Sequence, residues 1–332
     1  MNVLDALEDL ERQGGEGTIA LPGGKELRLT HLDKVYFPDE HITKGELLRY
    51  YVQVAPVLLP VMEDRPLVLH RFPNGISEKG FYQQKAPDDA PDAVRTANVA
   101  VEGGTREVRV IGGDLPTLLW CVQNGVLSVD PWLSRIGTLD AADFAVIDLD
   151  PGPRAPFTRV VAVARCIHDV LGELKLHGAV KTSGASGMHI FLPLPGKTSF
   201  ESAGLLAETI GATVVERMPK EATLQRAVKS RGATMVYVDC LQNVRGKSVA
   251  GAYAVRARPG APVSTPLEWA ELDGPVDPRA FTRDVVLQRI ARQGDLWAPA
   301  MARPNRLTAV ARPRPVRSGR DDPDHAARHR TR

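Results

Sequence analysis

Several features that define whole classes of protein are scarce or absent in this chain. It has only three cysteines in 332 residues, Cys121, Cys166 and Cys240, and they are far apart. An odd, scattered set argues against a disulfide framework or a zinc site. No apolar run approaches the roughly 18 residues that cross a bilayer, and the N-terminal residues lack the basic region of a secretory signal. We therefore expect a cytoplasmic protein with no membrane partner.

Charge is distributed unevenly along the chain. The net charge is +2 from 42 basic and 40 acidic residues, but residues 303–332 alone hold nine Arg and three Asp. The remaining residues carry a net charge of −4, so they would have to bind a polyanion through local basic patches. Residues 301–332 are rich in Pro and Arg and poor in apolar residues, which predicts a disordered tail. That tail either contacts nucleic acid or is a solvated extension without a function.

Short apolar strands alternate with amphipathic helices along the chain. Thr43 and Glu46 form a capping box that begins one helix, and apolar residues at helical spacing predict a second helix at Thr158–Leu174. Residues 18–30 predict a hairpin. The expected strands are Pro66–His70, Val108–Ile111, Phe144–Asp150, His189–Leu194, Thr234–Asp239 and Ala252–Arg258, and a helix from Thr282 to Arg292 would close the fold. The pattern predicts a mixed α/β fold.

Asp148 and Asp150 end the apolar run that starts at Phe144. If that run is a strand, residues i and i+2 project from the same face, so both carboxylates point the same way. Two convergent carboxylates are costly to keep ionised without a cation between them, and Mg²⁺ or Mn²⁺ suits such a pair. Alone, the acidic pair is more typical of a turn that opens into Pro151-Gly152.

A turn rich in glycine and serine occupies residues 182–189. Its two glycines allow backbone N–H groups to point together at an anion, and Ser183 and His189 can donate to phosphate oxygens. The alternative interpretation is a tight bend that binds nothing.

Two further expected strands end in charged residues. Asp239 closes the first, and Arg256 and Arg258 share one face of the strand expected at Ala252–Arg258. Three acids at strand ends beside an anion-binding turn are typical of a two-metal phosphoryl-transfer site. Paired guanidiniums suit a triphosphate, although these two could also face solvent.

Taken together, the motifs resemble the polymerase domain of bacterial DNA ligase D, a member of the archaeo-eukaryotic primase superfamily. The strongest matches are Asp-Leu-Asp-Pro-Gly (148–152), Ser-Gly-x-x-Gly-x-His (183–189), Val-Asp-x-x-Gln-Asn (238–243) and Arg-Ala-Arg-Pro-Gly-Ala-Pro-Val-Ser (256–264). The resemblance implies an α/β (α+β) primase-type catalytic domain at 21–300, with a mixed or antiparallel central sheet flanked by helices, after a helical extension at 1–20. Because no ligase or nuclease module is recognisable, the chain looks like a stand-alone form.

The resemblance implies roles for residues at the catalytic centre. Two divalent ions, Mn²⁺ or Mg²⁺, would be held by Asp148, Asp150 and Asp239. The nucleotide site would comprise Ser183, His189, Lys247, Arg256, Arg258 and Asp130, with Lys247 and its neighbour Asn243 in a family segment whose role is unassigned.

The resemblance implies a second group of residues for DNA. Lys34 and Lys44 match residues that hold the 5′-phosphate on the downstream side of a gap. Arg71 matches a basic residue near the template. Phe81 and Tyr82 match an aromatic pair that packs against a template base, and stacking of this kind is tolerant of sequence.

Two positions depart from the family pattern. Asp130 replaces a histidine that contacts the incoming nucleotide in relatives, and an ionised carboxylate cannot donate a hydrogen bond. Ser186 replaces a common lysine in the glycine-rich turn. Both changes weaken attraction for a triphosphate, but neither alters the three metal-binding acids.

The predicted function is template-dependent nucleotidyl transfer to a DNA 3′-hydroxyl, with ribonucleotides preferred, for gap filling or end extension in non-homologous end joining. The expected partners are NTP or dNTP, DNA ends carrying a 5′-phosphate and end-joining proteins, with a monomer at the bacterial nucleoid as the default. One alternative is a catalytically weakened relative that bridges or protects DNA ends. A metal-dependent phosphatase or glycosyltransferase is disfavoured, because neither explains Arg256 and Arg258.

Overall fold

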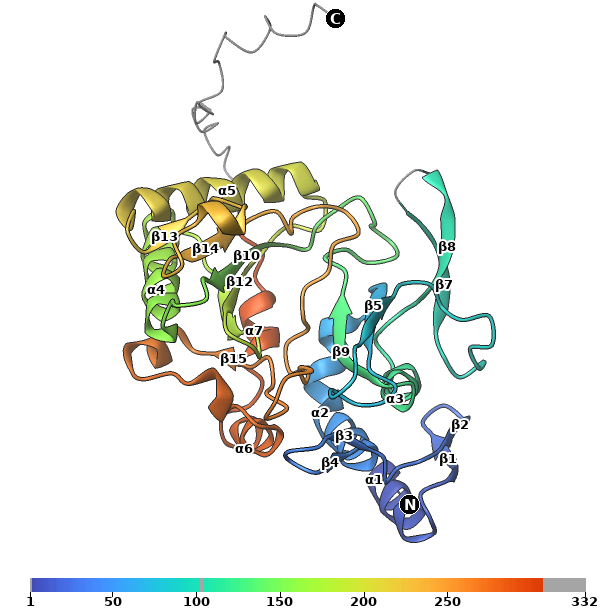
Figure 1. Cartoon of the computed structure of the whole chain (residues 1–332). Coiled ribbons are helices and arrows are strands. Elements are labelled where there is room, and N and C mark those ends of the chain that lie inside the picture. The colour runs from blue at the N-terminus through green and yellow to red at the C-terminus, as the bar shows by residue number, and fades with distance from the viewer. Residues whose placement is uncertain (1, 102–103, 307–332) are drawn as a thin grey trace, which may run out of the picture.

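The computed structural model describes residues 2–101 and 104–306. A six-stranded sheet from the C-terminal half and a three-stranded sheet from the N-terminal half occupy separate parts of the molecule (Figure 1). The segment at 247–265 joins them, because Gly251 N donates to Val129 O of the smaller sheet and Thr182 N of the larger sheet donates to Thr265 O.

The six-stranded sheet has the strand order β13-β14-β10-β12-β11-β15. Neighbouring strands are antiparallel except for the parallel pair β13 and β14. The strands are β10 (Phe144–Pro151), β11 (Ala179–Thr182), β12 (Met188–Pro193), β13 (Ala222–Thr223), β14 (Val236–Asp239) and β15 (Pro266–Leu267). The predicted mixed, largely antiparallel sheet is therefore present.

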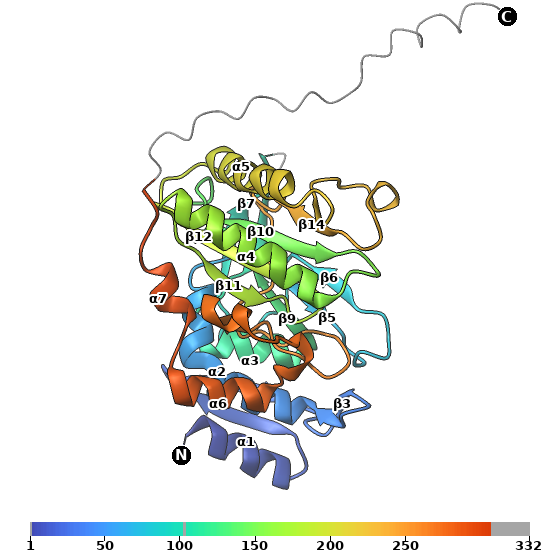
Figure 2. The ribbon, with the colours of Figure 1, turned by 90° about the vertical axis from the view of Figure 1, so that its left-hand side faces the viewer.

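The two faces of this sheet have different neighbours. Alternate residues of β10, such as Ile147 and Leu149, join the apolar core formed with helices α4 (Phe157–Glu173) and α5 (Phe200–Arg217). Both helices lie on the outer side of the sheet (Figure 2). The residues between them along the strand, including Val146, pack into the core shared with the N-terminal half. The period of two along each strand therefore places even-numbered β10 residues on the inner face.

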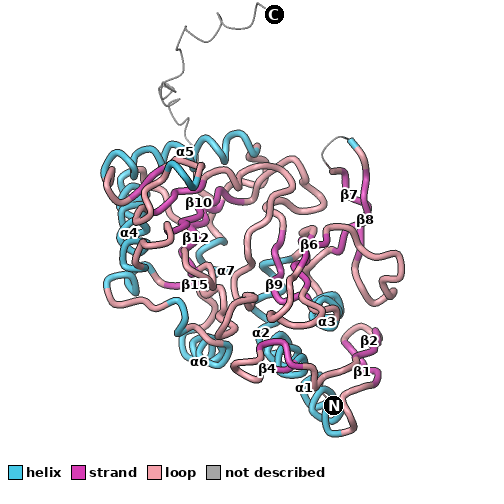
Figure 3. The backbone as a smooth tube through the Cα atoms, viewed as in Figure 1, coloured by secondary structure: helices cyan, strands magenta, loops and turns pink. Residues whose placement is uncertain are grey.

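The N-terminal half is built around helix α2 (Lys44–Met62), which contacts α1 (Val3–Arg12) and α3 (Leu115–Gln123). Its three-stranded sheet has the order β6-β5-β9, from Phe81–Gln83, Leu67–Arg71 and Val126–Pro131. Three hairpins complete it (Figure 3). They are β1 (Gly17–Leu21) with β2 (Lys25–Leu29), β3 (Val35–Phe37) with β4 (Ile42–Thr43), and β7 (Thr96–Ala100) with β8 (Arg106–Val110).

Most of the predicted elements are confirmed. The capping box is complete, since Thr43 accepts from the Glu46 backbone and Glu46 accepts from the Thr43 backbone. The helix predicted at Thr158–Leu174 is α4, and the hairpin predicted at 18–30 is β1 with β2.

The prediction of a strand at Ala252–Arg258 is wrong. That segment is a loop with one isolated bridge, between Val255 and Val263. Tyr253 has a φ of 68°, which an extended strand does not allow. Arg256 and Arg258 are therefore carried by a loop rather than by one face of a strand.

The C-terminal part of the described chain packs onto the body. It contains α6 (Arg283–Gln293) and α7 (Trp297–Met301), and the buried Asn305 donates to the backbone of His177 and Pro193. The tail predicted from residue 301 thus begins with packed residues, and its remainder, 307–332, lies outside the described residues. Among the described residues, no helix is long and apolar enough to span a membrane.

Candidate active site

Four polar residues stand in one line across the inner face of the six-stranded sheet. Asp239 on β14 is the register partner of Asp148 on β10, and Asp148 is the register partner of His189 on β12. His189 in turn pairs with Lys181 on β11. Residues that are directly opposite one another on neighbouring strands project from the same face. The strand register therefore gathers two acids, an imidazole and an amine that are distant in sequence.

The three predicted metal-binding acids are adjacent. Asp150 lies two residues after Asp148 on the same face of β10, and Asp239 is on the neighbouring strand. Asp148 is largely buried, with 17% of its side chain exposed. Burial, followed by the negative charges of Asp150 and Asp239, holds the pKa of Asp148 well above its ordinary value. A divalent cation at this place would relieve that repulsion, so the donor set fits hard metal ions.

The acids do not form a closed metal cage. Within the described residues, no group of three His, Cys, Asp or Glu side chains is arranged to hold an ion by itself. Asp239 instead accepts hydrogen bonds from Leu241 N at 2.8 Å and Gln242 Nε2 at 3.2 Å. This arrangement suits Mg²⁺-type sites, in which one or two carboxylates act together with substrate phosphates and water.

Lys181 is completely buried at the end of the polar line. Its Nζ lies 2.8 Å from His189 Nδ1 and donates to Ser264 Oγ at 2.5 Å. An ammonium group has donors and no acceptor, so the charged lysine requires Nδ1 to accept and leaves the proton of a neutral imidazole on Nε2. Nε2 is 3.4 Å from Asp148 Oδ1. Burial, then the charges of Lys181 and Arg256, hold the pKa of His189 well below its ordinary value, which keeps it neutral.

The glycine-rich turn joins β11 to β12 beside this line. Ser183 Oγ accepts from Ala185 N and Gly187 N, both at 3.1 Å, which leaves its hydroxyl proton free to donate. Gly184 has a φ of 68°, and a Cβ there would lie 2.4 Å from Arg256 Cγ. A Cβ on Gly187 would lie 2.2 Å from Leu149 O. Both glycines are therefore required by close packing.

The loop that carries Arg256 is hydrogen-bonded to helix α2. Tyr50 donates to Tyr253 O at 2.8 Å, and Val255 N donates to the hydroxyl of Tyr51 at 3.1 Å. Arg256 then donates to Ser183 O at 3.2 Å, which places its guanidinium at the turn. Arg258 is exposed two residues further along.

Asp130 reaches the site from the smaller sheet. It is buried on β9 and accepts from Ser128 Oγ at 2.6 Å. The pKa of Lys181 is held well below its ordinary value, first by burial and then by Arg256, and the negative charges of Asp148 and Asp130 partly offset this effect. The carboxylate that replaces the family histidine therefore lies within electrostatic reach of the buried lysine.

The predicted aromatic pair lies on the edge strand β6. Phe81 and Tyr82 are 48% and 63% exposed, which is unusual for large aromatic side chains. Tyr82 stacks on His70 with ring centroids 4.0 Å apart, and the Arg71 guanidinium lies 5.5 Å from the Phe81 ring centroid. The outer faces of both rings remain available for stacking.

Lys34 and Lys44 form a separate basic pair near hairpin β3–β4. Lys44 N donates to Lys34 O at 2.8 Å, and Lys44 Nζ donates to Thr30 O at 2.7 Å. Lys44 is buried, and burial together with the charge of Lys34 lowers its pKa to about 8. Hairpin β3–β4 lies apart from β10 and β14, the strands that carry the three acids (Figure 1).

Comparison with known proteins decides the family. The profile of the family described as "LigD, primase-polymerase domain" matches residues 43–297, which is most of the chain. The chain belongs to the LigD primase-polymerase domain family. The predicted family, the fold and, at the level of the family, a nucleotidyltransferase are thereby confirmed.

Individual LigD proteins match over the same region. The chain is 31% identical over 277 residues to the multifunctional non-homologous end joining protein LigD of Mycolicibacterium smegmatis, covering 83% of the chain and 36% of that protein. It is 30% identical over 274 residues to the bifunctional LigD of Bacillus subtilis, covering 82% of the chain and 44% of that protein. The chain thus spans less than half of these relatives.

A solved LigD structure has the same fold. The polymerase domain of Mycobacterium tuberculosis ligase D, solved in complex with DNA, superposes with a TM-score of 0.76 at 32% identity. The match covers 84% of this chain and 99% of that domain.

Within this LigD-type site, sequence reasoning missed three contributors. Lys181 and Ser264 meet only through the fold, and Gln242 is important because it donates to Asp239. A lysine inside the apolar run before the Thr-Ser-Gly turn was the available signal for Lys181. Asn243, whose role was unassigned, is buried and bonds both N and O of Val146, which makes it a structural residue. Lys247 is exposed and does not join the polar line.

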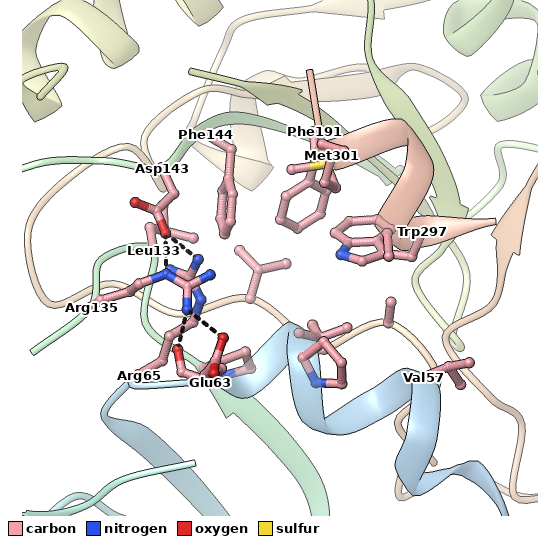
Figure 4. Close-up of a pocket in the computed structure, with 18 of the residues that line it drawn as sticks. Val57, Glu63, Arg65, Leu133, Arg135, Asp143, Phe144, Phe191, Trp297 and Met301 are labelled. Carbon is pink, nitrogen blue, oxygen red and sulfur yellow. Dashed lines mark hydrogen bonds and ion pairs between the residues drawn. The ribbon is translucent and has the colours of Figure 1, made fainter. Parts of the chain in front are cut away.

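A cavity of about 440 Å³ lies elsewhere on the inner sheet face, between Phe144, Phe191 and Trp297 (Figure 4). None of the predicted site residues lines it. The charged side chains in its wall pair with one another, because Asp143 accepts hydrogen bonds from both Arg65 and Arg135. The cavity is therefore separate from the acidic site of the LigD family fold.

Proposed function

We propose that this chain transfers nucleotides to the 3′-hydroxyl of DNA under direction of a template. The observation that supports it best is the register of Asp239, Asp148 and His189 across three strands, beside a turn that can bind phosphate. Membership of the LigD primase-polymerase family favours the same reaction.

Asp148, Asp150 and Asp239 would hold the two divalent ions, for which we propose Mn²⁺ in preference to Mg²⁺. When bound, such ions lower the pKa of an attacking hydroxyl and neutralise charge on the phosphates. The acids would orient the ions from one sheet face, because their two strands fix the positions of all three carboxylates.

The remaining residues bind and orient the triphosphate. The Ser183 hydroxyl and the Nε2–H of His189 donate to phosphate oxygens, and Arg256 supplies a permanent charge next to them. Because His189 is neutral, it donates a hydrogen bond without competing with the metal ions for the acids. Positioned donors of this kind stabilise charge that develops on the transferring group.

The DNA would be held at two places outside this centre. Lys34 and Lys44 would bind the 5′-phosphate beyond a gap, and Phe81 and Tyr82 would stack on a template base. We propose that the chain serves gap filling or end extension in double-strand break repair, with ribonucleotides preferred, as a partner of end-joining proteins.

The test is primer extension on a gapped duplex carrying a downstream 5′-phosphate, with Mn²⁺ and either ribonucleotides or deoxyribonucleotides. Asp148→Asn should abolish extension and leave binding of the gapped duplex nearly unchanged. Asp169→Asn on the exposed side of α4 is the matched control and should extend normally. Extension by the Asp148 variant at the wild-type rate would refute the mechanism.

A second candidate function is DNA-end bridging by a catalytically weakened relative. It is favoured by Asp130, which is buried where relatives have histidine, and by the exposed Ser186, which brings no positive charge to the turn. Tight binding of 5′-phosphorylated ends without any extension under the conditions above would select this function.

A further inference from the structure

A second pocket, of about 930 Å³, opens next to the acidic site. It lies between β6, Trp132 and the loop of residues 242–248. Among the described residues, its lining includes the basic side chains of Arg109, Arg245 and Lys247. Because the chain before residue 303 carries a net charge of −4, a cluster of basic side chains marks a place where an anion would bind.

The pocket connects the acidic site with the exposed aromatic edge. Gln242 lines it and also donates to Asp239 Oδ2. Tyr82 lines its other side, where the ring stacks on His70. A strand that passes over Tyr82 towards the acids would therefore cross the mouth of this pocket.

Two buried donors in the pocket wall have no partner among the described residues. They are Nε1 of Trp132, whose residue is only 3% exposed, and Nε of Arg109. The Arg109 guanidinium lies 5.3 Å from the Trp132 ring, and its other nitrogens donate to Gln84 and Glu107. Buried donors are normally satisfied, so each unpartnered one indicates a missing acceptor.

The cationic side of the pocket is open. Lys247 is exposed and has no ion-pair partner within the described residues. Arg245 approaches Asp140 at 3.3 Å, but Asp140 is 86% exposed, so solvent screens that pair. Both cations remain able to bind a phosphate.

We propose that this pocket receives one unpaired nucleotide of the DNA strand that passes Tyr82. Arg245 and Lys247 bind its phosphate and Tyr82 stacks on its base. The buried Nε1 of Trp132 and Nε of Arg109 supply donors for base acceptors once the side chains that cover them shift. A volume within the range of small-ligand sites admits a single nucleotide, and a base enters a concave pocket only when it leaves the helical stack. The inference rests on the proposed function, because it assumes that DNA is the partner.

The first test compares DNA affinity of Arg245→Ala/Lys247→Ala with that of the wild type by fluorescence anisotropy. For DNA with unpaired template nucleotides, affinity should fall on the order of tenfold, and the salt slope by about 0.7, the value for one phosphate contact on a single strand. Binding of a blunt duplex should stay unchanged. Lys197→Ala/Lys220→Ala removes the same charge from exposed sites elsewhere and is the matched control.

The second test asks whether the pocket holds the base. Trp132→Phe keeps an aromatic ring but removes the indole N–H and part of the ring volume, and its fold is checked by circular dichroism. It should bind DNA with an unpaired base several-fold more weakly than the wild type, and DNA with an abasic site at that position equally well. Equal affinity of the wild type for both DNAs, or no effect of the double variant, would overturn the inference.

These outcomes are distinguishable from failure of the proposed function. If the wild type extends primers but the double variant binds DNA normally, only the pocket assignment fails. If the wild type does not extend primers while the double variant still loses affinity for unpaired template, the pocket assignment holds and the catalytic proposal fails.

Discussion

Lys181 Nζ lies 2.8 Å from His189 Nδ1, and both residues stand on the strand register that leads to Asp148 and Asp239. The lysine is fully buried and forms no ion pair with a carboxylate of the described residues. Its contacts orient the imidazole and the Ser264 hydroxyl. A fully buried lysine is costly to stability because burial disfavours its protonated form and lowers its pKa, which suggests that it is retained for the site.

Lys181→Met should separate activity from stability. The catalytic efficiency for nucleotides should fall on the order of tenfold. This is the lower end of the range seen when a residue that supports an active-site side chain is removed. Unfolding free energy in urea should change little, because relief from a buried amine whose protonated form is disfavoured offsets the hydrogen bonds that His189 and Ser264 lose. A parallel loss of stability and activity would show that the lysine is merely structural.

Asp148→Asn should stabilise the protein when divalent ions are removed. The pKa of Asp148 is raised by burial and by two neighbouring acids, so its ionised form is costly near neutral pH. We expect a gain in stability in thermal unfolding with EDTA. Added Mn²⁺ should raise the Tm of the wild type and not that of the variant. An equal Mn²⁺ effect on both would place the ions elsewhere.

Binding of a 5′-phosphate should weaken between pH 7 and pH 9. Lys44 has a pKa of about 8, lowered from 10.5, so it loses its positive charge in that interval. Anisotropy with 5′-phosphorylated and 5′-hydroxyl ends should show the pH effect for the phosphorylated end only, and Lys44→Met should remove it. A pH effect of the same size for both ends would contradict the assignment.

The same group gives a stability prediction with a definite sign. Because the folded-state pKa of Lys44 lies below its unfolded value, the unfolded chain binds more protons between about pH 8 and 10.5. The contribution of Lys44 to the unfolding free energy therefore rises with pH across that window. The slope of urea stability against pH should be smaller in Lys44→Met than in the wild type.

Gly184→Ala should impair nucleotide binding through the backbone. The residue has a left-handed φ of 68°, and the new Cβ would meet Arg256 Cγ and Ser264 N. We expect a higher KM for nucleotide and a loss of stability of about 1–3 kcal/mol, typical of strain at such a position. Gly196→Ala, where nothing lies within 4 Å of an added Cβ, is the control and should change neither.

Asn243→Ala should destabilise the sheet without a direct effect on chemistry. Strand β14 pairs with β10 only from Asp148 onwards, so the side chain of Asn243 replaces a neighbouring strand at Val146. Its loss leaves a buried N–H and a buried C=O without partners, at a cost of about 1–3 kcal/mol each. Urea unfolding should show this loss, whereas the exposed Gln225→Ala should show none.

Local patterns predicted the parts of the fold that depend on neighbouring residues. The capping box at Thr43 and the apolar spacing of α4 were readable because their contacts lie within one or two helical turns. The strand prediction for Ala252–Arg258 failed because hydrogen bonds from that segment to the hydroxyls of Tyr50 and Tyr51, on a helix distant in sequence, hold it as a loop. No local pattern could reveal those contacts.

The sequence by itself determined that Asp148 and Asp150 share a strand face and that a glycine-rich turn precedes His189, since both follow from short-range backbone geometry. Only the tertiary structure decided that Asp239 lies directly opposite Asp148 and that Lys181 closes the same line. The physical reason is that strand periodicity is local, whereas register is set by hydrogen bonding and burial between segments that are far apart in the chain.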